Sequence, residues 1–273
     1  MVYRPVAIVI LAGLSSAWCP AQTANPAATG RAMLDGTRTS APGAAAPQAL
    51  NNPPTLTIEQ RGDILMARKQ YREAIDMFQQ GSPKDPVLCN KEGIAYHQLT
   101  QLGNARKSYE QALKLKPDYV EAMNNLGTIY YAQRSFRRAI SWYNKALKLA
   151  PSESRSASIY MNLGTAQFGR KKYEAATAAY QMALKIDPDV FEHHGNFGVM
   201  LEEHSVQERA KYHYYLAKLY AKDGRTEMAL QYLRKALEEG FKEKDKLNKD
   251  PEFAGMRDLP EFKQLIASEP RVL

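Results

Sequence analysis

Apolar and small residues recur at helical spacing within residues 120–153, VEAMNNLGTIYYAQRSFRRAISWYNKALKLAPSE. The first half places Leu126, Gly127 and Tyr130 within one and a half helical turns of each other. The second half repeats that spacing at Phe136, Ala139, Tyr143 and Ala146. Apolar residues three and four apart share one face of a helix, so this stretch predicts two amphipathic helices. Pro151 then ends the second helix, because its ring cannot continue an α-helical ladder.

The same pattern recurs on both sides of this stretch. The interval from Ala105 to Ala139 is 34 residues and that from Ala139 to Ala176 is 37, with three extra residues in the loop at 151–155. The preceding copy contains Gly93, Tyr96, Leu102, Ala105, Tyr109, Ala112 and Pro117. The following copy contains Leu163, Gly164, Tyr173, Ala176, Tyr180, Ala183 and Pro188. A weaker first copy contains Gly62, Leu65, Tyr71, Ala74 and Phe78.

This pattern resembles the tetratricopeptide repeat, a helix–turn–helix unit of about 34 residues. The resemblance implies an all-α fold, an α-solenoid wound as a right-handed superhelix of about five to six repeats with a C-terminal helical cap. It covers residues 55–243, most strongly 86–188. We expect units near 55–85, 86–119, 120–153 and 157–190, a degenerate unit at 191–209 and a final unit at 210–243.

Local signals agree with these helices. A threonine–x–x–glutamine capping box begins at Thr57, and Asp85 precedes a proline at the first helical position. Asp118 and Asp189 each lie three residues before a glutamate and predict the same kind of cap. The segment 244–273 is expected to cap the last repeat with a set of apolar anchors: Phe253, Phe262, Leu265 and Ile266.

The N-terminus reads as an export signal over residues 1–21. Arg4 supplies a basic start, the apolar run 6–14 is too short to span a bilayer, and small residues predict cleavage near Ala21. Lipidation of Cys19 is the alternative, and it is the only route by which we expect membrane contact. The bulky tryptophan before this cysteine argues against it.

Residues 22–54, rich in alanine and proline, are expected to form a disordered tether, because they contain few large apolar residues. Together with the export signal, this predicts a periplasmic or secreted protein. Cleavage would leave Cys89 as the only cysteine, so an intramolecular disulfide is excluded. Cys89 is expected to be a small buried hydrophobe.

The net charge is +8, which brings nucleic acid and anionic membranes into consideration as partners. We interpret the cations as interleaved with glutamates on solvated helix surfaces, and therefore expect no nucleic-acid partner. The densest group in the best repeat is Arg134, Arg137, Arg138, Lys145 and Lys148.

Candidate chemistry is sparse. Four histidines lie close together in the sequence, but no cysteine or carboxylate pattern completes a tetrahedral zinc set around them: His193, His194, His204 and His213. No phosphate-binding glycine loop, nucleophile elbow or H-E-x-x-H pattern is present. We expect no catalytic residues, no metal and no cofactor.

The resemblance implies that first helices line a concave groove. One groove position is asparagine in three successive units, Asn125, Asn162 and Asn196, and an amide can both donate to and accept from a peptide backbone. The predicted peptide-binding groove comprises Asn125, Asn162, Asn196, Glu121, Asn124, Thr128, Tyr131, Thr165, Phe168, His97 and Gln98. The alternative interpretation, that these asparagines serve to hold the fold together, remains open.

The leading hypothesis is a non-enzymatic scaffold that binds a peptide segment or protein partner in this groove. The alternative is a structural assembly factor of an envelope complex, such as pilus, secretion or outer-membrane machinery, that acts through convex or capping surfaces. A homo-oligomer is compatible with either hypothesis. An enzyme or metal protein built on residues 191–213 is the third and weakest reading.

Overall fold

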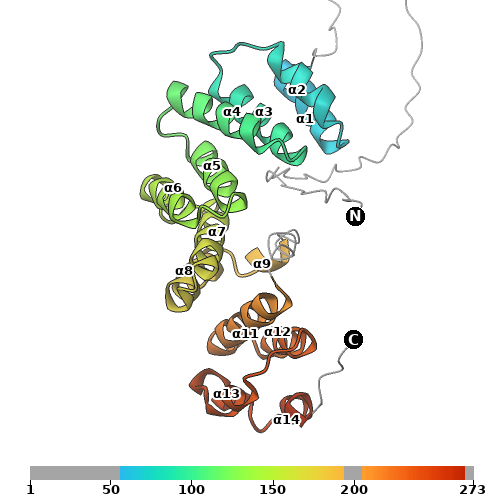
Figure 1. Cartoon of the computed structure of the whole chain (residues 1–273), viewed down its shortest axis with the longest axis vertical. Coiled ribbons are helices and arrows are strands. Elements are labelled where there is room, and N and C mark those ends of the chain that lie inside the picture. Colours follow the sequence, from blue (N-terminus) through green and yellow to red (C-terminus); the bar gives the residue numbers. More distant parts are fainter. Residues whose placement is uncertain (1–55, 194–204, 268–273) are drawn as a thin grey trace, which may run out of the picture.

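The computed structural model describes residues 56–193 and 205–267, which form helices joined by short connections (Figure 1). Five helix pairs follow one another: α1 (Ile58–Ala67) with α2 (Tyr71–Gln79), α3 (Pro86–Gln98) with α4 (Leu102–Leu115), α5 (Val120–Ala132) with α6 (Phe136–Leu149), α7 (Ser156–Gly169) with α8 (Tyr173–Ile186), and α11 (Val206–Lys222) with α12 (Thr226–Glu238). The short α9 (Val190–His193) lies between α8 and α11. The chain then forms α13 (Lys244–Lys249), the 3-10 helix η1 (Pro251–Met256) and α14 (Pro260–Ala267).

The predicted all-α solenoid of helix pairs is confirmed, because each pair packs on the next along the molecule (Figure 1). Three expectations fall on residues outside the described part: the export signal with Cys19, the tether at 22–54, and most of the degenerate unit. That unit contains Asn196, His194 and His204.

A glycine on the first helix lies against an aromatic ring on the second in each of the first four pairs. A Cβ added to any of these glycines would come closer than 3.0 Å to that ring. The pairs are Gly62 with Phe78, Gly93 with Tyr109, Gly127 with Tyr143, and Gly164 with Tyr180. The three tyrosines are 0–1% exposed, so the ring fills the space that the missing side chain leaves.

The turn between the two helices of a pair contains one residue in the left-handed region. In the first four pairs this residue is Lys69, Thr100, Arg134 or Lys171, with φ between 56° and 60°. In the last pair it is Gly224, with φ of 77°. Only glycine adopts this conformation without a steric cost, so the first four turns are strained and the last is not.

Two of the predicted caps are confirmed. Thr57 forms a capping box with Gln60, and the Asp85 side chain accepts hydrogen bonds from the first turn of α3. The cap predicted at Asp118 is wrong, because α5 begins one residue later and Tyr119 occupies its N-cap without a side-chain hydrogen bond. Ser205 supplies a further capping box, at the start of α11.

The C-terminal segment packs against the last helix pair. Phe253 and Phe262 are 0% and 1% exposed, and Leu265 and Ile266 are partly buried against the same cluster. The Tyr214 hydroxyl donates to the Asp250 carboxylate, and Lys218 lies 3.2 Å from both Asp250 and Glu252. The two aromatic anchors predicted for this segment are therefore buried as expected, and the two aliphatic anchors are partly buried.

Candidate partner-binding surfaces

Asparagines link the first helices of three successive pairs. Asn125 on α5 donates from Nδ2 to Oδ1 of Asn90 on α3, at 3.0 Å. Asn162 on α7 donates in the same way to Oδ1 of Asn124 on α5, also at 3.0 Å. Each bond joins neighbouring repeats, so these amides stabilise the stack. Asn90 was not among the predicted groove residues, although it lies 34 residues before Asn124 at the equivalent position of its repeat, and only the folded geometry pairs it with Asn125.

The exposed part of this ladder lies on α5. Glu121, Asn124, Asn125 and Thr128 are half-buried and lie on one face of that helix. Asn125 keeps its carbonyl oxygen and Asn124 keeps its amide nitrogen for further hydrogen bonds, because each uses the other end of its amide in the ladder. Arg155 donates to Glu121 at 2.6 Å and limits the face at its N-terminal end. This face therefore offers fixed donors and acceptors to a partner.

Thr128 and Thr165 form hydrogen bonds inside their own repeats. Thr165 donates to the Met161 carbonyl oxygen, so the hydroxyl of Tyr180, at 3.2 Å, must donate to Thr165. Thr128 likewise donates to its own helix, to the Asn124 carbonyl oxygen, and accepts from Tyr143. The equivalent residue in the α3–α4 pair is Ile94, and the Tyr109 hydroxyl has no hydrogen-bond partner among the described residues.

Five of the predicted groove residues are buried and cannot contact a partner directly: His97, Gln98, Tyr131, Thr165 and Phe168, at 1–6% exposed. This corrects their expected role as groove lining. Tyr131 packs on Phe136, with ring centroids 5.4 Å apart, and Phe168 packs edge-on against Tyr173 at 5.1 Å. Both rings also reach the next repeat: Tyr131 belongs to a buried cluster with Ile159 and Ala166 of α7, and Phe168 lies edge-on to Tyr212 of α11 at 5.6 Å. They fill the seam between consecutive repeats and so support the surface. Asn162 is 9% exposed and contributes mainly through its bond to Asn124.

His97 is the buried polar group whose protonation the fold disfavours most clearly. Burial lowers the pKa of His97 to about 4, and Nδ1 has no hydrogen-bond partner among the described residues. The imidazole is therefore neutral at physiological pH. It occupies the position that Tyr131 and Phe168 occupy in the next two repeats, where an aromatic ring fills the seam.

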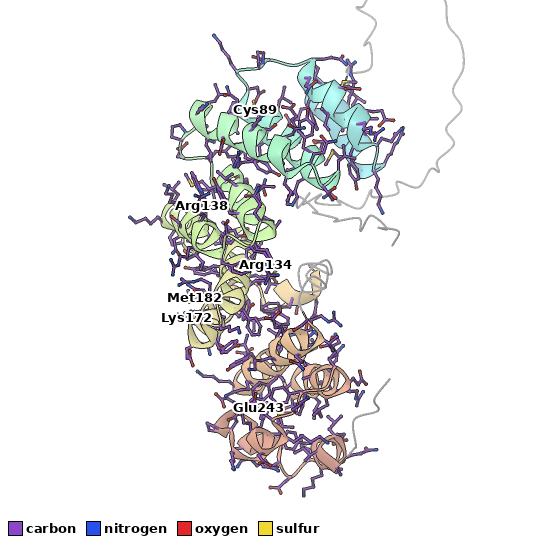
Figure 2. The ribbon with its side chains drawn as sticks, viewed as in Figure 1. Cys89, Arg134, Arg138, Lys172, Met182 and Glu243 are labelled. Carbon is purple, nitrogen blue, oxygen red and sulfur yellow. The ribbon has the colours of Figure 1, made fainter. Side chains whose placement is uncertain are left out.

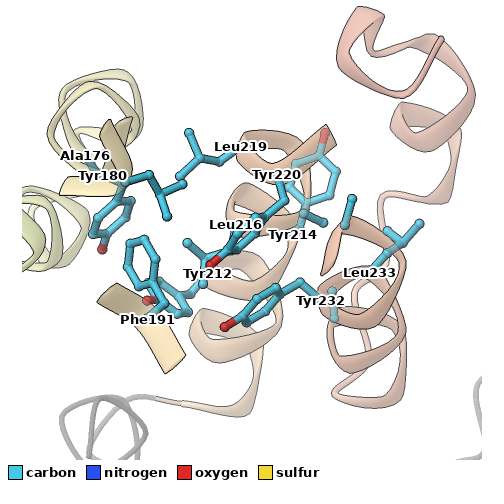
Figure 3. Packing of buried hydrophobic residues seen from close by; sticks show 14 of the residues in the cluster. Ala176, Tyr180, Phe191, Tyr212, Tyr214, Leu216, Leu219, Tyr220, Tyr232 and Leu233 are labelled. Atoms are coloured by element: carbon cyan, nitrogen blue, oxygen red, sulfur yellow. The ribbon is translucent and has the colours of Figure 1, made fainter. Parts of the chain in front are cut away.

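The junction between α8 and α11 is sealed by aromatic rings from three helices (Figure 3). Phe191 of α9 lies edge-on to Tyr180 of α8 at 5.4 Å and to Tyr220 of α11 at 6.4 Å. Tyr212 of α11 contacts Tyr180 at 5.9 Å. The aromatic residues of α9 and α11 thus fill the space between α8 and α11, where a regular solenoid would have another helix pair. The aromatic content of 206–222 was visible in the sequence, but its partners are distant in the chain.

A hollow of about 390 Å³ opens on this junction, where the α7–α8 turn meets the start of α11 and the end of α12. Tyr173 forms part of its wall and stacks on Tyr215 at 5.0 Å, with the Lys211 ammonium 5.3 Å from the Tyr173 ring centre. Lysines and glutamates share the rim: Lys171, Lys211, Lys242, Glu208 and Glu243. Its mixed charge favours no single ligand class.

The remaining candidates for chemistry are structural. Cys89 is buried, and burial raises the pKa of its thiol, which disfavours the reactive thiolate. His213 bonds Glu239 at 2.6 Å through Nδ1. Across the two described ranges, no group of three His, Cys, Asp or Glu side chains is placed to hold a metal ion. Within the same ranges, no helix is both long enough and apolar enough to cross a membrane.

Comparison with family models identifies the repeats. Tetratricopeptide repeat models match residues 90–154, 157–190 and 214–247. These stretches include α5 with α6, α7 with α8, and most of α11 with α12, so each match falls on helix pairs of the solenoid. The described helix pairs thus form an α-solenoid that contains tetratricopeptide repeats. Proteins built from this repeat generally bind other proteins.

Curated relatives share only part of their length with this chain. Uncharacterized protein ycf37 of Pyropia yezoensis is 42% identical over 62 residues, which cover 23% of this chain and 35% of that protein. The heat-shock protein cognate co-chaperone sgt12 of Aspergillus fumigatus is 29% identical over 126 residues, covering 45% and 36%. Protein O-mannosyl-transferase TMTC1 of Mus musculus is 37% identical over 83 residues, covering 29% and 9%. The chain therefore spans little more than a third of the length of these relatives, or less.

Solved structures of MamA are similar at a lower level. A crystal structure of MamA aligns with a TM-score of 0.45 at 20% identity, covering 69% of this chain and 96% of that one. MamA from Desulfovibrio magneticus RS-1 aligns with a TM-score of 0.46 at 21% identity, covering 66% and 92%.

Proposed function

We propose that this protein is a non-enzymatic scaffold that binds an extended segment of a partner protein along the exposed face of α5, in the bacterial periplasm or outside the cell. The observation that carries the proposal is the asparagine ladder: amides held in place by bonds between repeats still present free donors and acceptors at the surface. Pre-organised polar groups cost little entropy on binding and can pair with a peptide backbone whatever its side chains.

Export is part of the proposal and rests on the sequence of residues 1–21. Its basic residue, short apolar run and small-residue site are typical of a cleaved secretory signal. The mass of the protein purified from its native source tests this directly. A mature chain that begins near Gln22 would support export, and a retained N-terminus would contradict it.

A crosslinking experiment tests the binding face without disturbing the ladder. A photo-reactive amino acid at Ala132, half-buried at the C-terminal end of α5, should capture the partner in cells. The matched control carries the same amino acid at Gln231, which is exposed on α12 and lies away from the α5 face. Capture from position 132 and not from 231 supports the α5 face. Capture from 231 alone would move binding to the outer helices.

Alanine substitution of the asparagines is a weaker test of the α5 face than crosslinking. Asn125→Ala and Asn162→Ala each remove a bond between repeats, so lost binding would not separate a contact from a loosened stack. The crosslinking pair avoids this, because both positions keep the ladder intact.

A further inference from the structure

The outer surface of α6 is basic, and no acidic residue in the surrounding sequence balances its charge. Residues 122–152 contain no aspartate or glutamate, yet they carry five cations, which corrects the interpretation of interleaved charges. These side chains are exposed, and none forms an ion pair with a residue in the described ranges: Arg134, Arg137, Arg138, Lys145 and Lys148. Salt bridges elsewhere join cations to nearby acids, for example Arg106 with Glu110 on α4.

Exposed residues form one continuous row along this helix. Arg137, Ser141, Asn144 and Lys148 are spaced by four, three and four residues, and Arg138 and Lys145 flank them. From Arg137 to Lys148 the row is about 17 Å long, at 1.5 Å per residue. Cations at its two ends and polar side chains between them fit a segment of polypeptide.

Aromatic rings hold several of these cations in place. Lys145 lies 4.0 Å from the ring centre of Trp142, and Arg138 lies 5.7 Å from that of Tyr130. Arg134 lies 5.7 Å from the ring centre of Phe136. A cation resting on an aromatic face loses less freedom when it binds, and a guanidinium can then grip a carboxylate with two hydrogen bonds.

On α8, the second helix of the next pair, Glu174 and Lys185 are exposed, and the exposed residues between them are apolar. On α8 the residues equivalent to Arg138, Ser141 and Lys145 are Ala175, Ala178 and Met182, all exposed. Met182 is 39% exposed, and Figure 2 places it on the same side of the molecule as Arg138. The outer surface thus presents a basic row on α6 and, on the second helix of the next pair, a shallow apolar row on α8.

We infer that this outer surface is a second docking site, which binds an acidic amphipathic segment of a partner protein. Its carboxylates would meet Arg137, Arg138, Lys145 and Lys148, and its apolar side would lie over Ala175, Ala178 and Met182. The surface suits nucleic acid less, because the rings that could stack on bases are half-buried and covered by their own cations. It suits a membrane less, because the α6 row lacks exposed aromatic side chains to insert.

The test uses the full chain and two synthetic helical peptides. One peptide presents four glutamates at the spacing of the α6 cations with leucines on its other side, and the second has glutamine in place of each glutamate. The wild type should bind the glutamate peptide about tenfold more tightly than the glutamine peptide at low salt, and raised salt should remove this difference.

The variant with Arg137, Arg138, Lys145 and Lys148 all changed to Gln should bind both peptides equally. A matched variant with Arg72, Arg234, Lys222 and Lys249 changed to Gln loses the same charge elsewhere and should keep the preference. Arg137→Glu, a single change at a site with no aromatic contact, should by itself reduce the preference several-fold, about as expected for one exposed ion pair.

Equal binding of both peptides by the wild type would overturn the inference, as would equal losses in the two fourfold variants. Tighter binding to vesicles of equal parts phosphatidylcholine and phosphatidylserine, or to single-stranded DNA, than to the glutamate peptide would also overturn it. The inference is independent of the α5 face, since the crosslinking experiment reports on that face alone.

Discussion

The first four helix pairs (the regular pairs) and the final pair, α11–α12, fill the space between their two helices with different residues. In the α5–α6 pair, Gly127 makes room for the buried ring of Tyr143. Sixteen residues also separate Ala217 and Leu233 in the α11–α12 pair, and both are fully buried in one cluster. Compared with Gly127 and Tyr143, the final pair has a larger residue on its first helix, Ala217, and a smaller one on its second helix, Leu233. The comparison teaches that the repeat conserves a filled volume and not a particular residue.

The two kinds of pair also differ in the backbone strain of the turn between their helices. The regular pairs turn through lysine, threonine or arginine in the left-handed region, and the final pair turns through Gly224. The final pair is joined to the stack by aromatic rings, including Tyr212 of α11 edge-on to Tyr180 of α8 at 5.9 Å, where the regular pairs meet through the asparagine ladder.

Replacing Gly127 and Tyr143 with the residue types of the final pair should have the largest effect on stability. Gly127→Ala would place a Cβ 2.5 Å from Cε1 of Tyr143 and should cost about 1–3 kcal/mol of unfolding free energy. Tyr143→Leu should cost about 2–4 kcal/mol through the cavity it leaves. The double variant recreates the final pair and should cost at least about 1 kcal/mol less than the sum. Urea unfolding measures all three.

Gly103→Ala is the control for this exchange. No atom lies within 4 Å of a Cβ added at this exposed helical position, so the change should stabilise by about 0.5–1 kcal/mol. Strict additivity of the two packing substitutions would contradict the idea of a conserved volume.

Acid should weaken the regular stack before the final pair. His97 has a folded pKa of about 4, below its unfolded value of 6.5, so the unfolded state binds more protons between these values. Stability should therefore fall as the pH drops from 6.5 towards 4, by up to about 3 kcal/mol. Hydrogen exchange of α3 and α4, followed from neutral to acidic pH, measures this.

The final pair should respond at lower pH. Burial raises the pKa of Glu239, but bonds and charges from His213 and Arg209 outweigh burial and leave the pKa lowered. Its contribution is present above the unfolded pKa of 4.5 and is lost as the pH falls through the lower folded value. His97→Phe, which inserts the ring type of the neighbouring repeats, should abolish the earlier loss in α3 and α4. A wild-type profile retained in that variant would refute the assignment to His97.

Tyrosine hydroxyls should differ between neighbouring pairs. Tyr143→Phe removes the bond to Thr128 and should cost about 1 kcal/mol. Tyr109→Phe removes a buried hydroxyl that has no partner among the described residues, so it should be neutral or slightly stabilising. Thermal unfolding of the two variants gives the comparison, and equal losses would show that the bond to Thr128 contributes nothing.

Relief of turn strain should have the smallest effect. Thr100→Gly should stabilise by at most about 1 kcal/mol, because a β-branched residue with φ of 58° gives way to one that accepts this conformation. Gly224→Ala at φ of 77° should destabilise by a similar amount, about 1 kcal/mol. Melting temperatures that move in the same direction would contradict the strain argument.

The architecture was predictable because its determinants are local. Helix starts at Thr57 and Asp85, the glycine–tyrosine intervals and the terminal prolines all lie within one repeat. The groove was only partly predictable, because which face of a first helix remains exposed depends on how neighbouring repeats tilt. Tyr131 and Phe168 occupy predicted groove positions, yet packing against the next repeat, including Phe168 on Tyr212, helps to bury them.

The sequence by itself determined the helix pairs and their order, since periodicity and capping act over a few residues. It also determined the acid-free run that makes α6 basic. Only the tertiary structure decided that Asn90 meets Asn125, that His97 is neutral in a seam, and that Phe191 closes the junction before α11. Each of these depends on contacts between neighbouring helix pairs, whose relative placement is set by the summed packing of many side chains.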